Sequence, residues 1–146
     1  MPRPIKNNQG AALSFVIMIL VVVSIMVSIV ALIANANIKQ ASTQEKGLQA
    51  YYIARSGAEL AYEVLMTTTP SYIDEFKNGT RSTISKDSVD FDEGTADVAV
   101  TSSGTGDTQK ILITSVGTLK EGNITRTVKL EFYSHFEEHP EMVWSR

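Results

Sequence analysis

The stretch AALSFVIMILVVVSIMVSIVALIANANI, residues 11–38, decides the fold of this chain because it contains no charged residue. A helix needs about 20 apolar residues to cross the hydrocarbon core of a bilayer, and this stretch is longer. Its main polar interruptions are Ser14, Ser24 and Ser28, whose hydroxyls can bond a carbonyl one turn back. In lipid the backbone has no partner except itself, so we predict a transmembrane helix.

The residues on either side of the apolar stretch predict how it lies in the membrane. Arg3 and Lys6 come before it, which favours a cytoplasmic N-terminus and an external C-terminal part in a single-pass protein. A cleaved secretory signal is the first alternative, since ANA at 34–36 imitates a small-residue cleavage site. The apolar run is nearly twice as long as such a signal needs. A plain signal anchor is the second alternative, and these residues leave it open.

The helix is expected to continue beyond the membrane. No proline occurs between Pro4 and Pro70, and residues 48–66 show strong helical periodicity. We therefore predict one helix over residues 11–67, about 85 Å long at 1.5 Å per residue. Residues 11–38 would be its transmembrane and assembly half, and residues 39–67 its head-packing half.

The head-packing half carries two apolar stripes where an ordinary surface helix has one. This favours a helix with its own domain on one side and another molecule on the other. The stripe assigned to assembly consists of Ile53, Gly57, Leu60, Ala61 and Val64. The second stripe consists of Leu48, Tyr51, Tyr52, Ala58, Tyr62 and Leu65.

The remainder of the chain is predicted to form a small sheet. Residues 95–102, 109–119 and 123–134 alternate between apolar and polar side chains, and short turn-rich linkers join them. We expect an antiparallel meander over residues 95–134 packed on the helix, which is an α+β fold. Residues 68–94 would be a variable loop and residues 135–146 a polar tail.

Composition excludes several kinds of function. The chain has no cysteine, which excludes disulfides and thiolate metal sites. Its 13 basic residues, less Arg3 and Lys6, leave 11 against 16 acidic residues after the apolar stretch, a net charge of −5. That charge gives no support to nucleic-acid binding. We find no catalytic arrangement and expect no enzyme.

An acidic segment is the main candidate for a cofactor site. Asp87, Asp90, Asp92 and Glu93 precede a glycine, as oxygen ligands do in some calcium loops, but their spacing is not that of an EF-hand. Calcium is therefore a weak candidate, and a solvated acidic loop is the simpler interpretation. No other cofactor is expected.

The first ten residues, MPRPIKNNQG, form a short basic leader that ends in a glycine directly before the apolar run. This arrangement resembles the class III leader of type IV prepilins and pseudopilins. The segment YYIARSGAELA, residues 51–61, is similar to the region after the membrane helix in PilX-type minor pilins. The resemblance implies a pilin-like fold, with a stem helix and a β-rich head.

The same resemblance implies how the chain is processed and with what it assembles. A prepilin peptidase would cut between Gly10 and Ala11 and methylate Ala11. The partners would be other pilin or pseudopilin subunits, an inner-membrane assembly platform and, before assembly, membrane lipid. The product would be a filament at the cell surface or in the periplasm.

Phe15 departs from the family pattern, because most pilins carry a glutamate at this position. That glutamate is thought to neutralise the buried amine of a neighbouring subunit, and an unpaired charge in an apolar environment is costly. A subunit without it suits the first position of a filament. We therefore expect a minor pilin or pseudopilin that primes assembly or sits at the tip. The alternative is a single-pass anchored ectodomain that acts as an adhesin or sensor and never polymerises.

Overall fold

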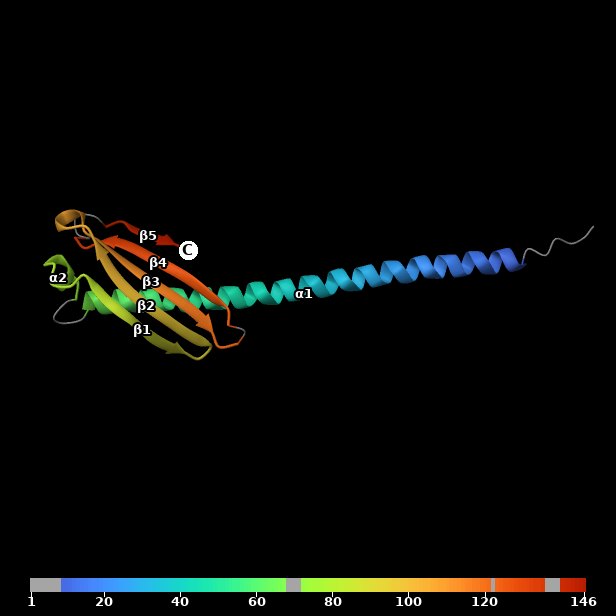
Figure 1. Ribbon diagram of the computed structural model, residues 1–146, viewed down its shortest axis with the longest axis horizontal. Coiled ribbons are helices and arrows are strands. Elements are labelled where there is room, and N and C mark those ends of the chain that lie inside the picture. Colours follow the sequence, from blue (N-terminus) through green and yellow to red (C-terminus); the bar gives the residue numbers. More distant parts are fainter. Residues whose placement is uncertain (1–8, 68–71, 122, 136–139) are drawn as a thin grey trace, which may run out of the picture. The chain divides into compact units, whose positions relative to one another are not determined.

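The computed structural model describes residues 9–67, 72–121, 123–135 and 140–146. In chain order its elements are α1 (Gln9–Thr67), α2 (Tyr72–Lys77), β1 (Thr83–Phe91), β2 (Gly94–Ser103), the 3-10 turn η1 (Gly106–Thr108), β3 (Lys110–Leu119), β4 (Thr125–Tyr133) and β5 (Met142–Ser145). They divide into two compact units, one up to Thr43 and one from Gln44 to Arg146, the head (Figure 1). The α+β class is confirmed.

The long helix is confirmed at both ends. α1 runs without a break from Gln9 to Thr67, against a predicted range of 11–67. Serine hydroxyls in its apolar half donate to carbonyls four residues back, as in the 2.8 Å bond from Ser24 Oγ to the Leu20 oxygen. This half is long and apolar enough to cross a membrane. Residues 1–8 of the expected leader lie outside the described residues.

The sheet is an antiparallel meander, as expected, and it is wider than expected. Its strand order is β1-β2-β3-β4-β5. The three predicted strands correspond to β2, β3 and β4, which pair in continuous register. β5 pairs with β4 from Met142 to Ser145, so the prediction that residues 135–146 are only a polar tail is wrong. Residues 136–139 of that tail lie outside the described residues.

The predicted loop over residues 68–94 is also wrong. Residues 68–71 lie outside the described part, but α2 and β1 occupy most of the remainder. β1 was not predicted because it is an edge strand that carries the carboxylates Asp87 and Asp90. Edge strands often carry charged side chains. A register shift between Ile84 and Asp87 also breaks its alternation of apolar and polar residues.

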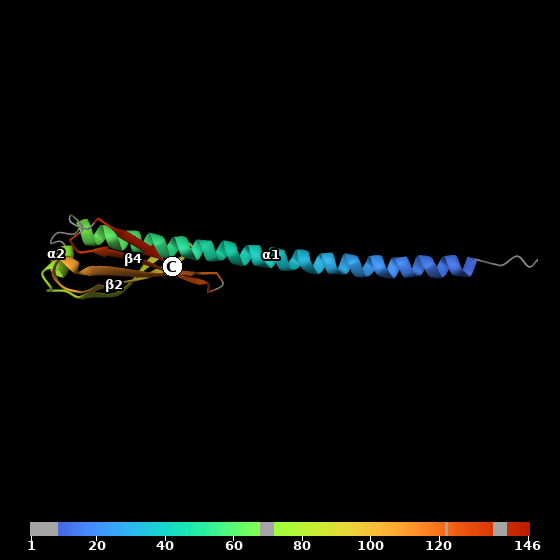
Figure 2. The same ribbon diagram turned by 90° about the horizontal axis from the view of Figure 1, so that it is seen from above.

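Small residues let α1 lie directly on the sheet. Ala50, Ala54 and Ala58 are fully buried, and Figure 2 shows the C-terminal part of α1 and the sheet as two layers. A Cβ at Gly57 would lie 2.6 Å from the Ala96 Cβ, and one at Gly117 would collide with the backbone of Ala50 and Ala54. The contact therefore brings backbone against backbone, which only glycine and alanine permit.

Larger side chains fill the space around this close contact. α2 buries Ile73 and Phe76, and the ring of Tyr62 meets that of Phe132 edge to face, with centroids 5.2 Å apart. The buried apolar side chains come from α1, α2 and the three strands β2, β3 and β4. They include Leu65, Phe76, Val98, Val100, Ile111, Ile113, Leu119, Val128, Leu130 and Phe132. The head thus has a core of its own.

Candidate functional site

The apolar half of α1 is the main candidate for a binding surface. Its large side chains are exposed on every side of the helix, from Leu13 at 64% to Leu32 at 70%. A helix that is apolar all round is stable in lipid or among other apolar helices, and not in water. This surface is therefore suited to lipid or to other apolar helices.

The N-terminal end of this half contains the residues of the predicted processing site. Gly10 and Ala11 are already helical, because α1 begins at Gln9. Ser14 Oγ donates to the Gly10 carbonyl at 3.0 Å. Phe15 is 65% exposed. The first acidic residue in the sequence is Glu45, so the apolar half provides no carboxylate to pair with an amine.

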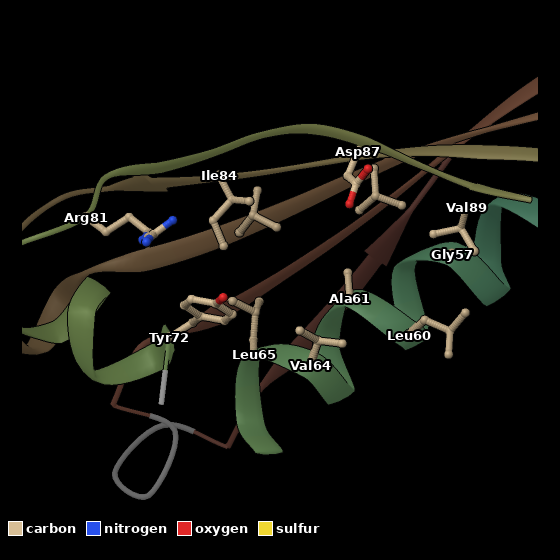
Figure 3. A pocket seen from close by; sticks show the side chains of 12 residues that line it. Gly57, Leu60, Ala61, Val64, Leu65, Tyr72, Arg81, Ile84, Asp87 and Val89 are labelled. Atoms are coloured by element: carbon tan, nitrogen blue, oxygen red, sulfur yellow. The ribbon is translucent and has the colours of Figure 1, made fainter. Parts of the chain in front are cut away.

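A second candidate is an apolar groove in the head, between α1 and β1 (Figure 3). It has a volume of about 290 Å³. Leu60 and Val64 of α1 form one wall and remain 42% and 50% exposed, and Ile84 and Val89 of β1 form the other. The groove exists because α1 leaves the edge strand only partly covered.

Polar groups lie at two places along this groove. At one end Arg81 bonds Glu75, Nε to Oε2, at 2.6 Å and lies over the ring of Tyr72. Along the β1 wall, the register shift after Ile84 places Asp87 on the groove side. The Asp87 carboxylate accepts a bond from the Ser88 amide. The groove is thus apolar along its length with one acidic group on its rim.

The structure divides the stripe that the sequence assigned to assembly. Ile53 and Gly57 are buried against the sheet of their own chain, so assigning them to assembly is wrong. Ala61 is half-buried. Leu60 and Val64 are exposed and stay available to another molecule. Helical spacing predicts which residues share one side of the helix, but not the angle at which that side meets a sheet. The sequence therefore could not separate the buried members of the stripe from the exposed ones.

The acidic residues proposed for calcium are not brought together. Asp87 and Asp90 belong to β1 and point to opposite faces of the sheet, and Asp92 and Glu93 form the turn before β2. Within the described residues no group of three potential metal ligands converges. The expected acidic loop is a strand and a tight turn.

No known family model, curated protein or solved structure matches this chain.

Sequence reasoning missed the contact between β5 and α1. The Arg55 guanidinium lies 5.2 Å from the ring centroid of Trp144 and bonds Glu59, Nε to Oε1, at 2.9 Å. The hydrogen bond to Glu59 raises the pKa of Arg55 above its ordinary value. The sequence signal for this contact is a single tryptophan, Trp144, and one isolated residue shows no periodicity.

Proposed function

We propose that this protein is a minor pilin or pseudopilin, a structural subunit of a type IV-like filament. One observation carries the proposal: a single helix is fully exposed and apolar in its first half and packed on an antiparallel sheet in its second. Such a helix serves as a membrane anchor before assembly and as a stem among other apolar stems afterwards. The proposed function is associative.

The boundary at Gly10 supports processing by a prepilin peptidase. A Cβ at Gly10 would meet nothing within 4 Å, so the helix itself does not require glycine there. A residue without a side chain does let a protease approach the backbone closely. We therefore assign this glycine to cleavage and not to folding. The mature chain would begin at Ala11, outside the cytoplasm after assembly.

Mass spectrometry of sheared surface material tests processing and assembly together. We expect mature peptides that begin at methylated Ala11, and their loss in cells without the prepilin peptidase. Gly10→Val should leave the Met1 terminus intact, whereas Gly10→Ala, the smaller change, should retain partial cleavage. An intact Met1 terminus in membranes with either peptidase genotype would favour a non-polymerising anchored ectodomain instead.

The position within the filament follows from Phe15. In a filament core, a subunit without an acid here leaves the amine of a preceding subunit unpaired, so first place suits it best. Immunogold labelling should therefore mark filament tips, and Phe15→Glu should allow labelling along the shaft. Shaft labelling with Phe15 in place would contradict tip placement.

A further inference from the structure

A pocket at the start of the head contains two arginines and no acidic residue. α1 contributes Gln44, Gly47, Leu48 and Tyr51, β4 contributes Arg126, and Arg146 follows β5. Its volume is about 340 Å³. We call it the arginine pocket. A site lined by two arginine side chains and by no acidic side chain is suited to an anion.

Both arginine side chains lie against α1 and remain exposed to solvent. Arg126 lies against the backbone of α1, where a Cβ at Gly47 would come within 2.8 Å of Nη2. Its Nη1 donates to the Thr125 carbonyl at 2.9 Å, which leaves other N–H groups for a ligand. The guanidinium carbon of Arg146 lies 4.7 Å from the ring centroid of Tyr51. The planar fork of a guanidinium group matches the oxygens of a phosphate.

The ion pairs within the described part of the chain do not involve these two arginines. They join Arg55 to Glu59, Arg81 to Glu75 and Lys110 to Glu131. The arginine pocket therefore keeps its charge in a head that is acidic as a whole. A local concentration of positive charge against the overall balance indicates a specific anionic partner.

The tether to the membrane indicates which anion is near. Ile38 ends the apolar stretch, and Gln44 is the first pocket residue. Six residues span at most about 20 Å even when fully extended. The polar headgroup layer extends about 5–7 Å beyond the hydrocarbon on each side. Whatever the orientation of the head, the arginine pocket stays within a short distance of lipid phosphates.

We propose that the arginine pocket binds the phosphate of an anionic phospholipid headgroup while the chain is in the membrane. This role is independent of the filament proposal, because it requires only a membrane-spanning first half. It would hold the head at the membrane surface until the subunit leaves. Each lysine or arginine side chain near an anionic membrane surface increases the binding constant about five-fold.

Trp144 provides a readout, because it is the only tryptophan and lies near Arg146 in the sequence. The full chain is reconstituted at one copy per nanodisc, in phosphatidylcholine with increasing phosphatidylglycerol. We expect its emission to change with phosphatidylglycerol, and Arg126→Gln to raise the half-maximal fraction about five-fold. Arg146→Gln should act similarly, and it lies outside the strands, where folding is least at risk.

Lys129→Gln is the matched control, since it removes the same charge from the same strand on the opposite face of the sheet. It should leave the titration unchanged. Equal titrations for the wild type and both arginine variants would overturn the proposal. A response to millimolar inorganic phosphate in pure phosphatidylcholine would assign the pocket to soluble phosphate and contradict the headgroup. A response only with several copies per disc would assign it to a protein carboxylate and also contradict it.

Discussion

The two halves of α1 share one backbone and differ in what surrounds them. In the first half, large side chains such as Met18 and Leu32 are exposed on all sides. In the second half, Ala50, Ala54 and Gly57 lie on a sheet with almost no space between backbones. Large exposed residues thus mark the first part of the helix, and small residues mark the part that packs on its own domain.

The largest effect is expected where backbone meets backbone. Gly117→Ala would place a Cβ against the Ala50 carbonyl and the Ala54 amide, and neither can move without shifting α1. We expect the head to lose about 3 kcal/mol of unfolding free energy or more. Denaturant titration of the full chain, followed by Trp144 fluorescence, measures this loss.

Gly10→Ala is the same change in the other half of the helix, where a Cβ would meet nothing within 4 Å. It should leave the unfolding midpoint of the head unchanged. Equal midpoints for the two variants would break the distinction between the halves.

A charge in the first half should affect membrane insertion and not folding of the head. Ile25 lies near the middle of the apolar stretch and is 55% exposed. Ile25→Asp should cost about 3–4 kcal/mol of insertion free energy, because the favourable contribution of isoleucine is lost as well. A translocon insertion assay measures it, with Ile25→Leu as the control. Normal insertion of the aspartate variant would show that this half does not cross the hydrocarbon core.

A smaller effect, of opposite sign, is expected from a buried hydroxyl. Ser115 Oγ is fully buried under α1 and has no hydrogen-bond partner within the described residues. Ser115→Ala should therefore raise the unfolding free energy of the head by about 1 kcal/mol. The counterpart in the first half is Ser14, whose exposed hydroxyl donates to the Gly10 carbonyl. Ser14→Ala should leave the unfolding free energy of the head unchanged. A destabilised Ser115→Ala variant would mean that this hydroxyl is paired.

The smallest effect is expected at the exposed ion pair across β3 and β4. Lys110 Nζ lies 2.6 Å from Glu131 Oε1, and this hydrogen bond raises the pKa of Lys110 above its ordinary 10.5. A raised pKa in the folded state stabilises fully below 10.5 and loses its effect as pH rises through the folded value. Wild type should therefore exceed Lys110→Gln slightly in melting temperature at pH 8, with the difference vanishing at strongly alkaline pH. A difference that grows with pH would contradict this sign.

How much the sequence could predict also differs between the two halves of α1. The uncharged stretch predicted the first half by itself, because a membrane accepts few other structures. For the second half, the sequence predicted a helix that packs on a sheet, but it did not predict which face of the helix makes the contact. Ile53 and Leu60 look alike in a periodic pattern, yet one is buried at 8% exposure and the other is 42% exposed. The angle between helix and sheet decides this, and it depends on close contacts at Gly57 and Gly117.

The outer strands escaped for related reasons. A central strand is predicted from the alternation of apolar and polar residues, since one of its faces is buried along its whole length. β5 has four residues, all exposed, and gains its place from pairing with β4 and from contacts of Arg55 with Trp144. These are tertiary interactions between segments far apart in sequence. The groove beside β1 and the arginine pocket therefore could not be predicted from the sequence.

Photo-crosslinking tests most directly the proposal that the first half of α1 exchanges lipid for other subunits while the second half stays with its own sheet. A photoreactive phenylalanine analogue is placed at Ile25 or, as the control, at Tyr62, which packs on Phe132 of its own chain. In sheared surface material, position 25 should yield adducts with other protein chains, and position 62 should yield adducts within the chain only. Lipid adducts alone at position 25, with no chain recovered outside the membrane, would contradict the account.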